Sequence, residues 1–205
     1  MPVFNQHKII FLHIGKTGGM SIERSLGLPE KDYRIFDQEF VYGLRKGVMT
    51  QHARLDYIDQ FLSEDQRQWF KFTTIRNPWH RMISAFYYLQ PRHLKQFGSF
   101  RKWLENKYES LVSNSWGEGS HYTPQISYTH KDGVQVVDEI LRTETLQDDF
   151  NQMCQRQKIE AKTLTRINRS RLREGKYLDD YDSITRDLVY EMYQDEIIHF
   201  GFRYE

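Results

Sequence analysis

The residues best suited to chemistry lie in a short segment at 13–21, whose sequence is His-Ile-Gly-Lys-Thr-Gly-Gly-Met-Ser. Its glycines, Gly15, Gly18 and Gly19, let the backbone approach a ligand and turn several N–H groups toward it. Lys16 adds a full positive charge, and the helix expected to follow adds a partial one at its first turn. The alternative is a glycine turn with a solvated lysine. The coincidence of lysine, hydroxyl and three glycines favours a phosphate-binding loop.

A second set of anion-binding side chains lies in the segment TTIRNPWHRMIS at 73–84. Arg76 ends a predicted strand, and Ser84 lies two turns into a helix that Asn77 caps and Pro78 begins. Arg76 and Ser84 can bind a phosphate near the start of that helix. The alternative is a capped helix with ordinary surface arginines. Together with the lysine loop, this segment indicates a ligand that is phosphorylated at two separated points.

The lysine loop matches only part of a P-loop. Gly15-Lys16-Thr17 fits the end of G-x-x-x-x-G-K-[ST], but Ile10 stands where the first glycine is needed. The strand before Arg76 does not end in the acidic residue that holds Mg²⁺ in P-loop NTPases. A small-molecule kinase with a degenerate P-loop is therefore a weaker alternative. A non-catalytic module that binds a nucleotide or a sulfated glycan is another.

These side chains need a sheet to position them. The nearly continuous apolar run KIIFLHI at 8–14 is typical of a parallel strand buried on both faces. The pattern predicts further strands at 33–36, 47–51, 69–75 and 134–141. It predicts helices from Ser21, at 55–69, from Pro78, at 99–111, from about 144, and around Ile184, Leu188 and Met192. The helix from Pro78 is expected to bury one face, formed by Met82, Ile83, Phe86 and Leu89. Residues 113–133 are expected to form a loop. The alternation favours an α/β three-layer fold with a mainly parallel central sheet, helices on both faces and a P-loop-like nucleotide-binding core.

Composition excludes several classes of protein. The chain has 205 residues, enough for one buried core, and 39% apolar with 28% charged residues is typical of a folded protein. A net charge of +1 gives no global field toward nucleic acid or an anionic membrane, so any anion site must be local. Cys154 is the only cysteine, which rules out an intrachain disulfide.

The N-terminal sequence lacks the features of a signal peptide, and no stretch approaches the ~20 apolar residues of a membrane span. We therefore expect no membrane segment and a cytoplasmic setting. A soluble domain trimmed from a membrane-anchored parent has the same features.

The two anion-binding motifs resemble those of sulfotransferases. HIGKTGGMS is similar to their 5′-phosphosulfate loop, H-I-P-K-T-G-G-T-S, and RNPWHRMISAFYY to their 3′-phosphate motif, R-[ND]-P-x-x-R-x-x-S-x-[FY]. Weaker similarities at 51–53, 121–125, 141–146 and 199–202 point to the carbohydrate (Golgi-type, family 2) group. The resemblance spans most of the chain and implies one sulfotransferase domain over residues 1–205.

The resemblance implies 3′-phosphoadenosine 5′-phosphosulfate (PAPS) as sulfuryl donor and adenosine 3′,5′-bisphosphate (PAP) as product. It implies metal-free transfer to a hydroxyl or amine, with carbohydrate as the acceptor class. Two departures from the motif weaken cofactor binding: Gly15 replaces a proline, and Gly19 and Met20 stand where many members have hydroxyl residues. The nucleotide-binding residues are then expected to be Gly15, Lys16, Thr17, Gly18, Gly19, Met20, Ser21, Arg76 and Ser84.

Two residues are expected to act in catalysis. Lys16 is placed to stabilise charge on the departing phosphate. His52 occupies the position of the histidine thought to be the base in the resembling enzymes, and a neutral imidazole has a suitable pKa. His121 is the reserve candidate, His13 is expected to support the loop, and either candidate base can instead be an ordinary surface or core histidine. The basic stretch at 166–176 can close over the nucleotide, contact an anionic acceptor, or simply be solvated. Oligomeric state is left open.

Overall fold

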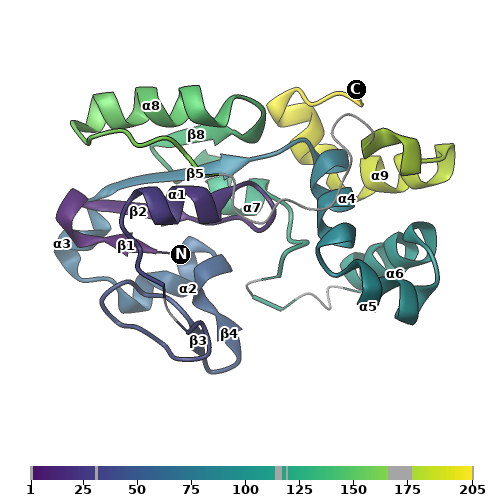
Figure 1. Ribbon diagram of the computed structural model, residues 1–205, viewed down its shortest axis with the longest axis horizontal. Coiled ribbons are helices and arrows are strands. Elements are labelled where there is room, and N and C mark those ends of the chain that lie inside the picture. The colour runs from purple at the N-terminus through teal and green to yellow at the C-terminus, as the bar shows by residue number, and fades with distance from the viewer. Residues whose placement is uncertain (1, 31, 114–116, 119, 166–176, 205) are drawn as a thin grey trace. The chain divides into compact units, whose positions relative to one another are not determined.

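The computed structural model describes residues 2–30, 32–113, 117–118, 120–165 and 177–204 (Figure 1). The chain divides into two compact units. The first is Met1–Ile75 with Gly117–Ile167, and the second is Arg76–Trp116 with Asn168–Glu205. A single domain over the whole chain stays a prediction.

The first unit contains a four-stranded sheet in the order β1 (Val3–Phe4), β2 (Ile9–Leu12), β5 (Phe70–Ile75) and β8 (Glu139–Arg142). β2, β5 and β8 are parallel to one another, and β1 is an antiparallel edge strand. All four residues of β2 are buried, as the apolar run predicted. The mainly parallel sheet expected from the sequence is confirmed.

Helices flank this sheet. α1 (Gly19–Ser25) and α8 (Leu146–Gln157) pack with it in one apolar cluster. Ile10 and Leu12 alternate with the cluster residues Ile9 and Phe11, so they point to the opposite face, and they too are fully buried. Both faces of the sheet are therefore covered, as expected for a layered α/β fold. The cluster consists of Phe4, Ile9, Phe11, Ile22, Leu26, Leu28, Phe72, Leu141, Phe150, Met153 and Cys154.

The rest of the first unit consists of short elements. These are η1 (Asn5–His7), the hairpin β3 (Leu44–Arg45) and β4 (Val48–Met49), η2 (Thr50–His52), α2 (Leu55–Ile58), η3 (Asp59–Phe61), α3 (Glu64–Arg67), α7 (Ile126–Thr129), the hairpin β6 (His130–Lys131) and β7 (Val134–Gln135), and η4 (Thr143–Thr145).

Five expectations for these segments need correction. Residues 33–36 form no strand, and the strand at 47–51 shrinks to β4, which pairs with β3 outside the main sheet. The helix at 55–69 breaks into three pieces, because Leu62 is extended and Ser63 starts α3 with its own capping box. The loop at 113–133 contains α7 and β6, and the strand at 134–141 divides into β7 and β8.

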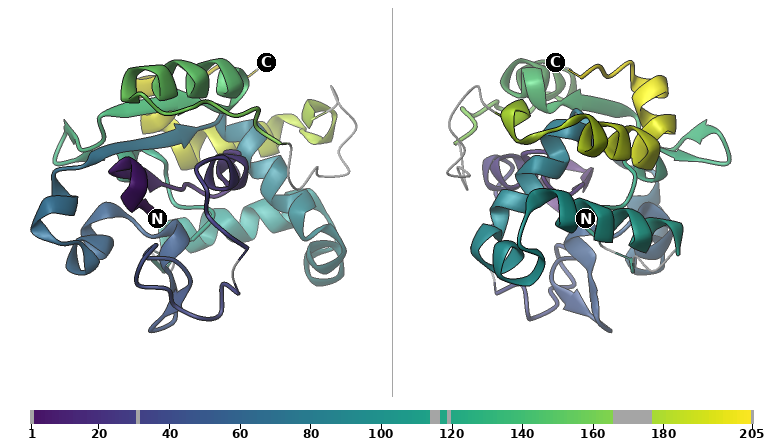
Figure 2. Two further views of the ribbon diagram at one scale, coloured as in Figure 1. Left: turned by 60° about the vertical axis from the view of Figure 1, so that its left-hand side comes forward. Right: turned by 90° about the vertical axis from the view of Figure 1, so that its right-hand side faces the viewer.

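The second unit is helical, with α4 (Pro78–Tyr88), α5 (Gln90–Phe97), α6 (Phe100–Val112), η5 (Tyr177–Asp180) and α9 (Ser183–Phe200). α9 packs against α4 and α6 (Figure 2). The predicted Asn77 cap is confirmed: its side chain accepts a hydrogen bond from the Trp79 N–H, and Pro78 is the first helical residue.

The expected single buried face of α4 is wrong. Every residue from Pro78 to Phe86 except His80 is buried, whereas Leu89, which was assigned to the buried face, is 41% exposed. Leu89 lies just past the end of the helix, where it no longer follows the helical wheel. Among the described residues, no helix is both long and apolar enough to cross a membrane.

Candidate functional site

The loop between β2 and α1 has a strained backbone. Lys16 has φ 71° and Gly18 has φ 84°, so both lie in the left-handed region. This conformation suits glycine, but for lysine it costs about 1–2 kcal/mol, and such residues cluster at functional sites. Lys16 is half-buried rather than fully solvated. The conformation is therefore held by the surrounding structure.

Thr17 attaches this loop to the sheet. Its fully buried hydroxyl donates to Ile14 O at 2.7 Å and accepts from the Thr74 hydroxyl at 2.6 Å. Thr143 Oγ1 lies 3.0 Å from Thr17 O and 2.9 Å from Ile75 O. The hydroxyl that we expected to contact a phosphate is thus bonded to the loop and to β5.

Gly19 is required by a close neighbour, and Gly18 by its left-handed backbone. A Cβ on Gly19 would lie 2.3 Å from His13 Cδ2, and one on Gly18 would lie 2.8 Å from Leu146 Cδ2. Met20 and Ser21 follow in the first turn of α1, both half-buried, and the Ser21 N–H donates to Gly18 O at 3.1 Å.

Beneath the loop lies a buried polar network that sequence reasoning missed. His13 Nδ1 lies 2.5 Å from Glu23 Oε1, and Gln51 Nε2 donates to both Glu23 oxygens at 3.1 and 3.0 Å. The three side chains come from the end of β2, from α1 and from η2, and all are buried. Because a buried carboxylate needs partners, the network joins these three elements. His13 supports the loop, as expected.

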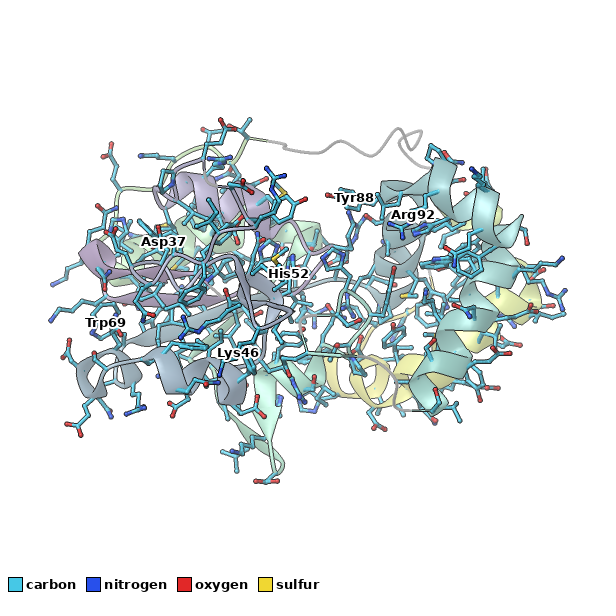
Figure 3. All side chains as sticks on the ribbon, turned by 90° about the horizontal axis from the view of Figure 1, so that it is seen from below. Asp37, Lys46, His52, Trp69, Tyr88 and Arg92 are labelled. Atoms are coloured by element: carbon cyan, nitrogen blue, oxygen red, sulfur yellow. The ribbon has the colours of Figure 1, made fainter. Side chains whose placement is uncertain are left out.

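His52 is oriented by the backbone. Its Nδ1 lies 3.0 Å from His13 O. A carbonyl can only accept, so Nδ1 carries the proton and Nε2 carries the lone pair. Tyr128 donates its hydroxyl to His52 O at 2.7 Å, a second contact that sequence reasoning missed. Figure 3 labels His52 among the side chains of the first unit.

The surroundings of His52 keep its imidazole neutral. Burial lowers its pKa well below the ordinary 6.5, and the nearby His13 and His121 lower it further. The side chain is neutral at pH 7 and has its lone pair on Nε2, the form that can accept a proton.

The two candidate bases lie together. The rings of His52 and His121 are 4.5 Å apart between centroids, at 89° to each other. The ring of His13 also lies 4.5 Å from that of His52 between centroids, at 70° to it. Gly15, next to Lys16, contacts His121 closely, because a Cβ on Gly15 would lie 2.7 Å from His121 Cδ2. The lysine loop and the histidines thus form one contiguous group in the first unit.

The residues of the second anion-binding motif lie in the second unit. Arg76 directly follows β5 and is half-buried. Asn77 Nδ2 donates to Arg203 O at 2.7 Å, which fixes the start of α4. Ser84 is 7% exposed and Arg81 1%, and the Arg81 guanidinium lies 5.9 Å from the centre of the Tyr193 ring.

Other sequence features take no part in this group. His93 is buried, with Nδ1 2.7 Å from Phe86 O and its ring against Phe86 and Trp103, so it is a core histidine. The basic stretch at 166–176 lies outside the described residues. Within the part of the chain that the structure describes, no group of three or more His, Cys, Asp and Glu side chains could hold a metal ion.

Comparison with known proteins gives one match. A family model described as "Sulfotransferase family" matches residues 1–203, which include both anion-binding motifs. No curated protein and no solved structure gives a significant match to the chain.

Proposed function

This chain belongs to the sulfotransferase family, and we propose that it transfers a sulfuryl group from PAPS to a hydroxyl or amine of an acceptor, with carbohydrate as the acceptor class. The observation that carries the proposal is the neutral His52, with its lone pair on Nε2, in the same group of side chains as the strained Lys16 loop. A proton acceptor and a positive charge are the two groups that such a transfer needs.

The chain offers suitable donors for both phosphate groups of PAPS. Gly15, Gly18 and Gly19 place no side chains of their own on the loop, which leaves its N–H groups able to approach a phosphate, and Lys16 adds positive charge. We assign the loop residues Gly15–Ser21 to the 5′-phosphosulfate. Because the Thr17 hydroxyl is bonded to Ile14 and Thr74, its share in this assignment is its main-chain N–H. We assign Arg76 and Ser84 to the 3′-phosphate.

In the proposed reaction the acceptor oxygen forms a bond to sulfur as the bond from sulfur to the 5′-phosphate oxygen breaks. His52 Nε2 takes the proton of the acceptor hydroxyl. Lys16 stabilises the negative charge that develops on the bridging oxygen, where the bonding electrons remain. Arg76 and Ser84 fix the register of the nucleotide and so act through orientation.

The test is thermal unfolding of the whole protein with PAP alone and, separately, with ATP and Mg²⁺. A ligand at 100 times its Kd adds about 2.7 kcal/mol, which raises the Tm of a chain of this length by roughly 5–10 °C. We expect that rise with PAP alone. Arg76→Ala should abolish the rise, whereas a control that removes an exposed arginine of α5, Arg92→Ala, should keep it.

The other outcomes select the alternatives. A rise with ATP and Mg²⁺ only would support a small-molecule kinase. A rise with PAP but no transfer from PAPS to any carbohydrate, together with no effect of His52→Ala, would support a non-catalytic binding module.

A further inference from the structure

His121 is packed between two residues of the proposed site. Its ring stands at 89° to the ring of His52, with 4.5 Å between centroids. It also lies against Gly15. A Cβ added there would lie 2.7 Å from His121 Cδ2, 3.0 Å from Cγ and 3.2 Å from Cα. His121 thus connects the backbone of the lysine loop to the ring of the proposed base.

At position 15, an added Cβ would meet His121 before any other residue. The three nearest atoms to the added Cβ all belong to His121, and the φ of Gly15 lies outside the left-handed region. Unlike Gly18, it needs no special backbone conformation. The ring of His121 fills the space that any side chain at position 15 would take.

The remaining contacts of His52 are already fixed. His13 O accepts its Nδ1 proton, the His13 ring lies against it at 4.5 Å, and Tyr128 holds its carbonyl. Glu23 bonds to His13 Nδ1, and Gln51 donates to Glu23. His121 is the contact of the His52 ring that comes from the segment before α7.

We propose that His121 is a positioning residue: backed by Gly15, its ring holds the ring of His52 so that Nε2 keeps one direction. The inference rests on the proposed function of His52 as base. It replaces the choice between two candidate bases with a division of roles, in which His52 takes the proton and His121 fixes its orientation.

Two substitutions of His121 separate positioning from proton transfer. His121→Ala removes the ring, and we expect kcat to fall about 10–100-fold because the base is misplaced, with KM for PAPS within about twofold. His121→Phe keeps an aromatic ring of similar shape but has no nitrogen, so it should recover most of kcat. Loss of activity in His121→Phe as deep as in His121→Ala, at every pH, would overturn the proposal and make His121 the base.

The pH profile gives a readout that loss of structure alone would not produce. Among the described residues, the rings of His13 and His121 lie against the His52 ring, Tyr128 bonds the His52 carbonyl, and Glu23 bonds His13. Removing the His121 ring rehydrates His52 and removes a neighbouring charge, and both effects raise the pKa of His52. The acid limb of kcat should therefore move to higher pH in His121→Ala. An unmoved limb would count against the proposal.

A double-mutant cycle tests the link to Gly15 without any assay of transfer. The readout is the NMR titration of the His52 imidazole in the whole protein. Gly15→Ala should displace His121 and shift the pKa of His52 in the same direction as His121→Ala does. In the His121→Ala background the same substitution should add little, since of the three nearest contacts only the 3.2 Å one to Cα remains.

Gly117→Ala is the matched control, because no described residue lies within 4 Å of a Cβ there and its φ is outside the left-handed region. Equal effects of Gly15→Ala in both backgrounds would refute the link. If the wild-type protein transferred no sulfuryl group, the proposed function would fail, yet the titration would still decide whether His121 holds His52.

Discussion

Lys16 and Thr17 are adjacent in sequence, but the structure gives them different roles. Thr17 is fully buried, and its hydroxyl is bonded to Ile14 and Thr74. Lys16 is half-buried and lies in the left-handed region, a conformation that lysine seldom adopts. At the scale of single residues, Thr17 holds the loop in place and Lys16 is the residue available for chemistry.

These assignments predict which substitutions lower turnover and which weaken nucleotide binding. Lys16→Ala should lower kcat by about 10²–10³-fold, because the charge it neutralises develops only in the transition state. Its effect on the Kd of PAP should be much smaller, since PAP lacks the sulfuryl group. Arg76→Ala should instead raise the Kd of PAP more than it lowers kcat. Calorimetric titration with PAP and initial rates with PAPS measure the two quantities.

The control for lost charge is Lys131→Ala, which removes an exposed lysine of β6. It should change neither quantity. Equal losses of kcat and PAP affinity in Lys16→Ala would show that Lys16 only binds the nucleotide.

At the scale of elements, the loop and α1 are held by the packing of Gly19 against His13. Gly19 is the first residue of α1 and its φ is outside the left-handed region, so helix propensity alone would favour alanine by about 1 kcal/mol. A Cβ would, however, lie 2.3 Å from a ring that Glu23 fixes in place. Such overpacking typically costs about 1–3 kcal/mol, so the clash outweighs the propensity.

We therefore expect Gly19→Ala to lower the free energy of unfolding by about 1–2 kcal/mol, as measured by urea denaturation. Gly117→Ala is again the control and should leave that free energy within about 0.5 kcal/mol. Wild-type stability in Gly19→Ala would mean that the His13 ring moves aside easily, and the network beneath the loop would then be looser than the contacts indicate.

The elements also show what sequence alone can establish. β2, β5, α4 and α6 were predictable, because an apolar run, a proline after a capping asparagine and a helical period are local signals. The strand expected at 33–36 depends instead on a partner strand elsewhere in the chain. Its apolar residues Tyr33 and Ile35 are 55% and 69% exposed, and no described strand pairs with them in the main sheet. The apolar residues Tyr33, Ile35 and Phe36 do not by themselves reveal whether a partner strand exists.

The candidate site was also predictable only in part, because some of its residues stand out in the sequence and others do not. The glycines and Lys16 stand out by spacing, and His52 and His121 were both identified from their positions in the resemblance. Their contact was not foreseen, because it depends on how distant segments pack. Glu23 was missed because a glutamate on a short helix normally faces solvent. Its burial depends on His13 and Gln51, which approach it only in the folded chain.

At the scale of the whole molecule, acid sensitivity is built into both units. Burial lowers the pKa values of His52 and His93 below 6.5, and burial together with Lys162 lowers that of His7. In the unfolded chain these histidines gain protons as the pH falls through 6.5, while in the folded chain they stay neutral to lower pH. The unfolded state then binds more protons, so stability rises with pH through this range.

We expect the free energy of unfolding to be higher at pH 7.5 than at pH 5.5, with a slope of at most about 1.4 kcal/mol per pH unit from each histidine. His52, whose pKa is lowered the most of the three, should contribute most. His52→Asn keeps an amide that can donate to His13 O but cannot titrate, so it should flatten the slope. Urea denaturation across this pH range measures the effect, and equal stability at both ends would contradict it.

The strand order has a consequence for synthesis on the ribosome. β5 pairs with β2 on one side and with β8 on the other, and in both pairings the partners are more than sixty residues apart along the chain. Neither neighbour of β5 is therefore supplied by an adjacent hairpin. The sheet cannot be completed until residue 142 has left the exit tunnel, so until then β5 has an unpaired edge. During that interval the nascent chain exposes the strand that leads to Arg76, and a chaperone bound to the emerging polypeptide would protect it from aggregation.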